Sequence, residues 1–148
     1  MDPVAVSVTV ARPREEVFDH LDVLANHAPF LDHMYKKWTY SGPPRGVGAK
    51  GQATVSAPGS SEVAEFELVE SVRPERIVEE GVSAKGNRRT RGTYSFEQHS
   101  GGGTKIDFEL AWTAVPRSER IFPPLSRIFL RRALGKAMRR LGKELEQG

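Results

Sequence analysis

The chain has 148 residues, of which 38% are hydrophobic and 28% charged, a composition typical of one globular domain and not of a disordered chain. It has no cysteine, which excludes disulfides and cysteine-ligated metals, and no apolar run approaches the roughly 18 residues of a membrane-spanning helix. The net charge of +3 is concentrated at the end, where residues 117–148 contain nine basic and three acidic side chains. The first residues lack the basic and apolar regions of a secretory signal, so we expect one cytoplasmic domain over residues 1–148.

The first part of the chain is predicted to form one strand and two short helices. Valines alternate with smaller or polar residues between positions 4 and 10, which is the pattern of a half-buried strand. Pro13 suits the first turn of a helix, and two glutamates follow it near the positive end of the helix dipole. Asp22 can cap a second short helix, which Pro29 interrupts.

From about residue 34 to residue 115 the hydrophobic pattern has a period of two. The clearest strand spans residues 105–112, where charged or small residues alternate with large apolar ones. Glycine- or proline-containing turns at residues 42–46, 73–75 and 100–103 separate the strands. Alternation with only one apolar face indicates an antiparallel sheet whose other face is in water.

The last long element is predicted to be a helix. After Pro123 and Pro124 the apolar period changes to 3.6, so residues 125–146 should be mostly one helix. This helix is the only long element able to cover the apolar face of the sheet. The sequence therefore predicts an α+β fold, in which a curved antiparallel sheet of six to seven strands wraps around the C-terminal helix. Because such a sheet has more inward surface than one helix covers, we expect an internal cavity.

Four local segments occur in this order along the chain: ARPREEVF at residues 11–18, GVGA at 46–49, RPERI at 73–77 and GTKI at 103–106. Together they resemble the START-like superfamily, also called SRPBCC, which includes polyketide cyclases, lipid-transport domains and proteins of the birch-pollen-allergen type. The resemblance covers nearly the whole chain and implies a helix-grip fold with a cavity for hydrophobic ligands. It does not fix a reaction, because the superfamily includes enzymes, carriers and partner-binding proteins.

Three sequence features suggest ligands that we do not expect. Residues 46–51, GVGAKG, match the dinucleotide pattern G-x-G-x-x-G, but that mechanism needs a helix after the glycines, and strand-like residues follow here. We therefore predict a glycine-rich turn. The basic residues between 85 and 91 have no stacking aromatics or known motif beside them, so nucleic acid is an improbable partner. The four histidines lack the spacing of zinc ligands, and we expect neither a metal nor another cofactor.

Large apolar side chains on the inferred inward faces are the candidates for lining the cavity. Each of them could equally fill a solid core. A cavity is favoured because the sheet is too wide for one helix and because buried tryptophan and tyrosine need polar partners, which a ligand can offer. The candidate cavity residues are Trp38, Tyr40, Phe66, Leu68, Tyr94, Phe96, Phe108, Leu110, Trp112, Phe129 and Met138.

Candidate catalytic residues are few, because no serine is paired with a histidine by spacing and cysteine is absent. Glu70 follows Phe66 and Leu68 at every second position, so its carboxyl is expected to face inward with them and to have a raised pKa. The alternative is that Glu70 marks an exposed strand end. His27 and His33 flank Pro29 near the expected cavity mouth. These three residues are the candidates for acid–base work, and the sequence leaves open whether any reaction is catalysed.

The leading hypothesis is that the protein binds a hydrophobic small molecule (a lipid, a polyketide-like or an aromatic compound) in an internal cavity. One alternative is an enzyme of polyketide cyclase or dehydratase type, without a covalent nucleophile. The other is an interaction module that docks an anionic membrane or an acidic macromolecule through the basic helix. A solvated outer face would also explain the helix charges, which are Arg131, Arg132, Lys136, Arg139, Arg140 and Lys143.

Overall fold

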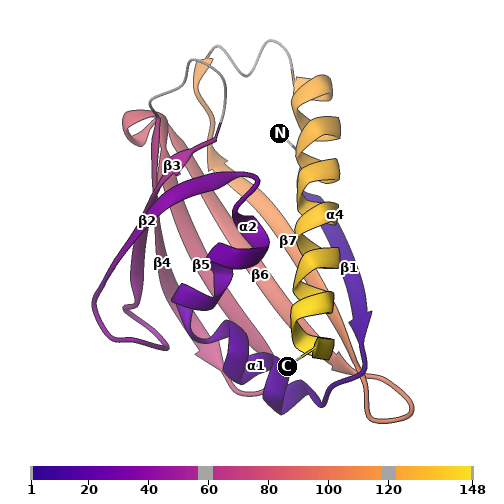
Figure 1. The fold of residues 1–148 in the computed structure, drawn as a ribbon. Helices are drawn as coiled ribbons and strands as arrows, with labels where there is room; N and C mark the ends of the chain where they lie inside the picture. The colour runs from indigo at the N-terminus through magenta and orange to yellow at the C-terminus, as the bar shows by residue number, and fades with distance from the viewer. Residues whose placement is uncertain (1, 57–61, 118–122, 148) are drawn as a thin grey trace.

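The computed structural model describes residues 2–56, 62–117 and 123–147, and the side chains of all of these except residues 123–126. One strand, β1, precedes three short helical segments, and six strands and the long helix α4 follow (Figure 1). The elements are β1 (Val4–Val10), α1 (Arg14–Leu21), η1 (Leu24–His27), α2 (Ala28–Leu31), β2 (Tyr35–Ser41), β3 (Lys50–Val55), β4 (Val63–Val72), β5 (Arg76–Ser83), η2 (Ala84–Gly86), β6 (Arg88–Gln98), β7 (Thr104–Ala114) and α4 (Pro123–Gln147).

The strands form one seven-stranded antiparallel sheet in the order β1-β7-β6-β5-β4-β3-β2. Neighbouring strands from β2 to β7 are consecutive in sequence, whereas β1 pairs with β7 and forms the edge of the sheet opposite β2. Figure 1 shows this sheet curving around the face on which α4 and α2 lie. The predicted α+β helix-grip arrangement is confirmed, with seven strands and a C-terminal helix over residues 123–147.

Helix α4 packs along the inner face of the sheet beside β1. Leu134, Ala137 and Leu141 on its inner face are buried, and burying a leucine side chain stabilises a fold by roughly 1.5–3 kcal/mol. Gly142 lets the helix approach the sheet closely, because a Cβ there would lie 3.3 Å from Cγ2 of Val8. The helix thus covers β1 and β7, and leaves the middle of the concave face to be covered by other groups.

The short helices close one end of the sheet. In α1, Val17, Phe18 and Leu21 are buried while both first-turn glutamates are exposed, as the apolar spacing predicts. The second predicted helix is a 3-10 turn, η1, that continues directly into α2. These elements place His27 and Phe30 in the interior, where both are fully buried.

The glycine-rich segment at residues 42–48 is a turn, as predicted. Gly42, Gly46 and Gly48 have positive φ angles, which glycine adopts without steric cost, and a Cβ at Gly42 would lie 2.4 Å from the carbonyl oxygen of Gly48. Strand β3 follows this turn instead of a helix. The backbone groups therefore do not form the helix N-terminus on which pyrophosphate binding depends.

Candidate functional site

A cavity of about 620 Å³ lies between the concave face of the sheet, α2 and α4. Most of its lining is apolar or aromatic, and a smaller group of polar side chains interrupts it. The apolar and aromatic lining residues are Phe30, Leu31, Met34, Val55, Ala64, Phe66, Val82, Phe108, Leu110, Trp112, Phe129, Leu130, Ala133, Leu134, Ala137 and Met138. The polar ones are His33, Tyr35, Ser56, Glu62, Glu79, Ser83, Arg88, Thr90 and Tyr94. A concave, largely apolar site with a few polar groups is the usual form of a small-molecule pocket.

The structure brings seven of the eleven predicted cavity residues to this lining. They come from β4, β6, β7 and α4, and they are Phe66, Tyr94, Phe108, Leu110, Trp112, Phe129 and Met138. The positions of these side chains around one space follow from the alternation of the strands, which directs every second residue to the concave face.

The other four predicted residues do not line the cavity. Leu68 and Phe96 are buried in the solid part of the core, where the ring of Phe96 lies 6.0 Å from that of Phe18 in an edge-to-face contact. Trp38 and Tyr40 lie on the edge strand β2 and stack on each other at 5.9 Å, with Tyr40 44% exposed. The pairing of β2 with β3 shifts between Lys36 and Thr39, and such a bulge interrupts the simple alternation.

A buried carboxyl group that the sequence analysis did not select lies in the wall of the cavity. Glu79 is on β5 between Ile77 and Gly81, and all three face inward. Its neighbour on β6 is Gly92, where a Cβ would lie 3.1 Å from Cγ of Glu79 and 2.9 Å from Cε1 of Phe108. The absence of a side chain at Gly92 therefore gives the Glu79 carboxyl and the Phe108 ring their space.

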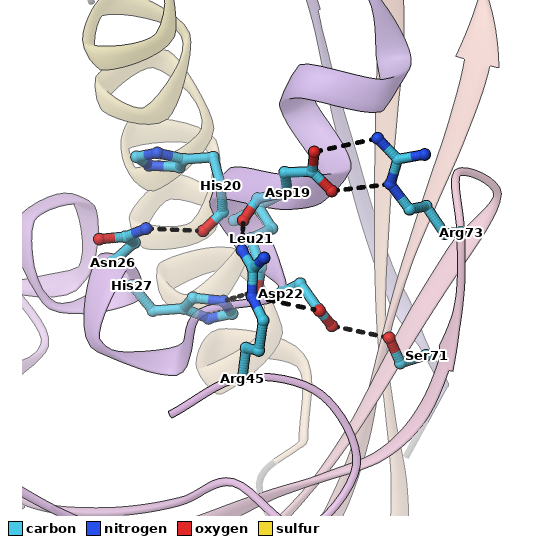
Figure 2. Close-up of polar contacts among 9 residues, drawn as sticks. All are labelled: Asp19, His20, Leu21, Asp22, Asn26, His27, Arg45, Ser71 and Arg73. Atoms are coloured by element: carbon cyan, nitrogen blue, oxygen red, sulfur yellow. Dashed lines mark hydrogen bonds and ion pairs between the residues drawn. The ribbon is translucent and has the colours of Figure 1, made fainter. Parts of the chain in front are cut away.

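His27 lies behind this carboxyl and is held by the end of helix α1. The last carbonyl groups of a helix lack partners within it, and side chains supply them here, as Figure 2 shows. Arg45 donates to the carbonyl of Asp19 at 2.9 Å, Asn26 donates to that of His20 at 2.9 Å, and His27 Nε2 donates to that of Leu21 at 2.7 Å.

This hydrogen bond fixes the proton on Nε2 of His27, because a carbonyl oxygen only accepts. In a neutral ring the other nitrogen, Nδ1, is then an acceptor. It is buried and has no hydrogen-bond partner within the described part of the chain, and it lies 3.8 Å from Oε2 of Glu79. The rings of Phe30 and Tyr94, at 5.4 and 5.6 Å, enclose the imidazole.

Burial shifts the protonation equilibria of this pair in opposite directions. Loss of water lowers the pKa of His27 to about 4 and raises the pKa of Glu79 to about 7, because each group is costly to charge in an apolar surrounding. Burial, and to a smaller extent the nearby charge of Glu79, raises the pKa of Tyr35 to about 12. The same two causes raise the pKa of Tyr94. Near neutral pH the cavity wall therefore carries two protonated phenols and a half-ionised carboxyl, and a neutral imidazole lies behind the carboxyl.

The expectation that Glu70 faces inward with a raised pKa is wrong. The register of β4 against β5 shifts between Leu68 and Glu70, and the extra residue of this bulge turns Glu70 to the outer face of the sheet. There its carboxylate accepts hydrogen bonds from Arg76, which hold its pKa below the usual value. The same bulge directs Ser71 toward Asp22, to which its hydroxyl donates at 2.7 Å.

His33 lines the cavity beside α4. Its Nε2 donates to the carbonyl of Ala133 at 2.9 Å, and its Nδ1 accepts from Arg140 at 3.1 Å. Arg140 also binds the Asp32 carboxylate at 2.7 Å. These bonds hold α2 against α4, so the geometry gives His33 a structural role at the rim of the cavity.

The basic residues of α4 do not all lie on one open surface. Arg131, Arg132, Lys136, Arg139 and Lys143 are exposed, whereas Arg140 is half-buried in the contact with His33 and Asp32. A shallow groove on the outer side of the helix is lined by Arg127, Ile128, Arg131, Arg132, Gly135 and Arg139. Arg127 donates to the carbonyls of Asp2 and Pro3 at 3.1 and 2.8 Å, which fastens the start of the chain to the helix.

Comparison with known proteins identifies the family. A family model described as polyketide cyclase / dehydrase and lipid transport matches residues 1–146. The chain belongs to this family. No curated protein matches its sequence.

Solved structures show the same fold at low sequence identity. The protein TTHA0849 from Thermus thermophilus has a TM-score of 0.72 and 17% identity over 97% of both chains. The crystal structure of Ara h 8.0201 has a TM-score of 0.73 and 10% identity over 99% of both chains. DynU16, a putative protein in the dynemicin biosynthetic locus, has a TM-score of 0.69 and 17% identity; the match covers 100% of this chain and 48% of the DynU16 chain. The family description supports the binding of hydrophobic ligands in general terms, and these structures show the shared fold.

Two further findings concern the described residues alone. They contain no group of three or more histidine, aspartate and glutamate side chains placed to hold a metal ion. No helix among them is long and apolar enough to cross a membrane.

Proposed function

We propose that the protein binds an apolar small molecule (a lipid, a polyketide-like or an aromatic compound) in the cavity between α4 and the sheet. The observation that supports this most directly is the cavity itself, about 620 Å³ of space lined mainly by aromatic and aliphatic side chains. Transfer of an apolar ligand from water to such a surface is favourable by roughly 25 cal/mol for each Å² buried.

The chain offers an internal reporter for this binding. Trp112 lines the cavity, whereas Trp38 lies on β2 outside it, and these are the two tryptophans of the chain. The Trp38→Phe variant therefore retains a single tryptophan at the site. N-phenyl-1-naphthylamine, an uncharged apolar probe, should quench its fluorescence saturably, and the Trp112→Phe variant should respond weakly to the same probe.

A variant that fills the cavity provides the decisive comparison. Ala133 lies on the cavity side of α4, and Lys136 lies on its exposed side less than one turn away. Ala133→Trp should abolish probe binding by occupying the space, whereas Lys136→Trp, with the same added bulk in water, should retain it. Equal binding by both variants, or no saturable binding of any apolar probe by the wild type, would contradict the proposal.

A second candidate function is docking on an anionic lipid surface through α4. Ile128 and Phe129 are 51% and 66% exposed, and Arg131 and Arg132 follow them on the next turn. Exposed apolar side chains beside cations are the pattern of helices that bind at the surface of anionic bilayers. Because Phe129 also lines the cavity, docking at this position would bring the cavity opening to the membrane.

A further inference from the structure

The geometry points to an acid–base site inside this cavity, in which the Glu79 carboxyl exchanges a proton with an uncharged, carbonyl-bearing apolar ligand and His27 positions that carboxyl. The inference deepens the proposed binding function and rests on it. It concerns Glu79, a buried residue of the cavity lining, and His27, which lies beside its carboxyl.

The first support is that Glu79 is available to a ligand. The carboxyl lines the cavity, and it forms no hydrogen bond with another described residue. Buried carboxyl groups are usually satisfied by hydrogen bonds, and because this one lines the cavity, a polar group of a bound ligand can supply the partner. A carbonyl oxygen accepts a hydrogen bond from the protonated carboxyl, and an acidic C–H group offers its proton to the carboxylate.

The second support is the arrangement of His27. Its Nδ1 acceptor is buried without a hydrogen-bond partner among the described residues and faces Oε2 of Glu79 at 3.8 Å. The bond to Leu21 prevents the ring from turning this nitrogen away. Contacts of this length between catalytic groups often shorten when substrate binds. His27 can therefore accept a hydrogen bond from the carboxylic acid and favours its protonated form.

The charges that face Glu79 make an uncharged ligand preferable. His27 faces it from η1, Tyr35 from β2 and Tyr94 from β6, and none of the three is a cation at neutral pH. Among the described lining residues the one arginine, Arg88, is engaged with Glu62 and Ser83. A ligand carboxylate beside Glu79 would meet a second negative charge, which raises the free energy of binding.

The proton transfer itself is balanced within the site. The Glu79 carboxylate takes a proton from the carbon next to the ligand carbonyl; the C–H electron pair forms a C=C bond, and the carbonyl π pair moves onto the oxygen. The protonated phenols of Tyr35 and Tyr94, which line the same cavity, can donate hydrogen bonds to this enolate oxygen. Return of a proton from Glu79 to carbon regenerates the ketone. Because the carboxylic proton exchanges with water, the carbon acquires a solvent hydrogen.

The test uses 2-tetralone, an apolar bicyclic ketone, and tetralin, its hydrocarbon analogue, in heavy water. Binding of both compounds is measured by their competition with N-phenyl-1-naphthylamine. Deuterium uptake at the carbon next to the carbonyl is followed by proton NMR. The wild type should accelerate uptake over the buffer rate, with a rate that rises with pH around a midpoint near 7, because the carboxylate is the base. Glu79→Gln should lose about a hundred- to ten-thousandfold of that acceleration while retaining binding.

Two further variants separate chemistry from packing. Glu80→Gln removes a carboxylate from the exposed side of the same strand and should leave uptake unchanged. His27→Leu should move the pH midpoint downward, because leucine has no acceptor to favour the protonated carboxyl; a purely structural role would weaken binding without moving the midpoint. Ketone binding without accelerated uptake, or equal uptake by Glu79→Gln and wild type, would overturn the acid–base site and leave the binding function standing. Binding of tetralin but not of 2-tetralone would overturn it too, and binding of neither compound would contradict the proposed function and this inference together.

Discussion

Replacing Glu79 by glutamine should stabilise the protein at neutral pH and leave its stability unchanged in mild acid. The carboxyl is buried on the inner face of β5, and burial raises its pKa from the ordinary 4.5 to about 7. In the unfolded chain the group ionises freely at pH 7, whereas in the folded protein ionisation is opposed. Folding is therefore penalised by the charge, and glutamine removes that penalty with nearly the same shape.

The magnitude follows from proton linkage. A folded-state pKa above the unfolded value means that the contribution of Glu79 to stability is fully present below pH 4.5 and is lost as the pH rises toward 7. The interval from 4.5 to about 7, at about 1.4 kcal/mol for each pH unit, corresponds to about 3 kcal/mol. The variant should therefore equal the wild type below about pH 4.5, exceed it by about 2 kcal/mol at pH 6, and exceed it by about 3 kcal/mol above pH 7.

Urea unfolding followed by tryptophan fluorescence, at a series of pH values from about 4.5 to 8, measures this difference as a change in midpoint at constant slope. Glu80→Gln is the matched control, because Glu80 is the next residue of the strand and its carboxylate is exposed beside Arg91. The control should show a pH-independent change below about 1 kcal/mol, as is usual for exposed ion pairs. A Glu79→Gln effect that does not grow with pH would refute the raised pKa and with it the buried environment assigned to this carboxyl.

Three other predictions follow from particular contacts. Gly92→Ala should destabilise the protein by about 1–3 kcal/mol in urea unfolding, because the new methyl group meets Phe108 at 2.9 Å and Glu79 at 3.1 Å. Gly135→Ala on α4, whose new methyl group would have its nearest neighbour at 3.5 Å, should instead stabilise the protein by up to about 1 kcal/mol. The reverse order of stabilities would contradict the assigned packing. Vesicles containing phosphatidylglycerol should bind the wild type more tightly than neutral vesicles do, with salt weakening the contact because charges are screened beyond about 8 Å at physiological ionic strength. Replacing Ile128 by serine together with Arg131 and Arg132 by glutamine should abolish this binding, Lys143→Gln should not, and equal affinity for neutral vesicles would count against docking. The Glu79→Gln variant should lose stability as the pH falls from about 6.5 to 4, because the folded-state pKa of His27 is lowered to about 4. Adding His27→Gln should remove this loss, and urea unfolding of the single and double variants checks it.

Periodicity predicted the architecture because the sheet and the helix each bury one face. The alternation of residues 105–112 and the 3.6 period after Pro124 correspond directly to β7 and α4. Each of these patterns depends only on which side of an element faces the core, so it is visible in a single sequence. The same reasoning placed Phe108, Leu110 and Trp112 at the cavity wall, where the structure has them.

The prediction from strand alternation failed where a strand contains an extra residue. The bulge between Leu68 and Glu70 turns Glu70 to the outer face, and the irregular pairing after Lys36 leaves Trp38 and Tyr40 outside the cavity. A bulge changes hydrogen-bond register without a compositional signal of its own, so the sequence could not locate it. Glu79 was accessible to the same parity argument, since it alternates with Ile77 and Gly81. It was missed because the acids in the strands were expected to face water.

The buried pair explains how a fold can hold two costly groups without becoming sensitive to pH. In the unfolded chain near pH 5.5 the glutamate is ionised and the histidine carries the proton, whereas in the folded protein burial reverses both states. Within this pair, folding therefore moves one proton from His27 to Glu79 and takes up none from solution, so the contribution of the pair to the free energy of unfolding is nearly independent of pH between about 4.5 and 6.5. Removing Glu79 exposes the histidine contribution and makes stability rise with pH; removing His27 makes it fall. Replacing both residues by hydrophobic ones would remove the cost of burying two ionisable groups and stabilise the fold, so the proposed proton transfer to a ligand is supported by groups that the fold holds at a cost in stability.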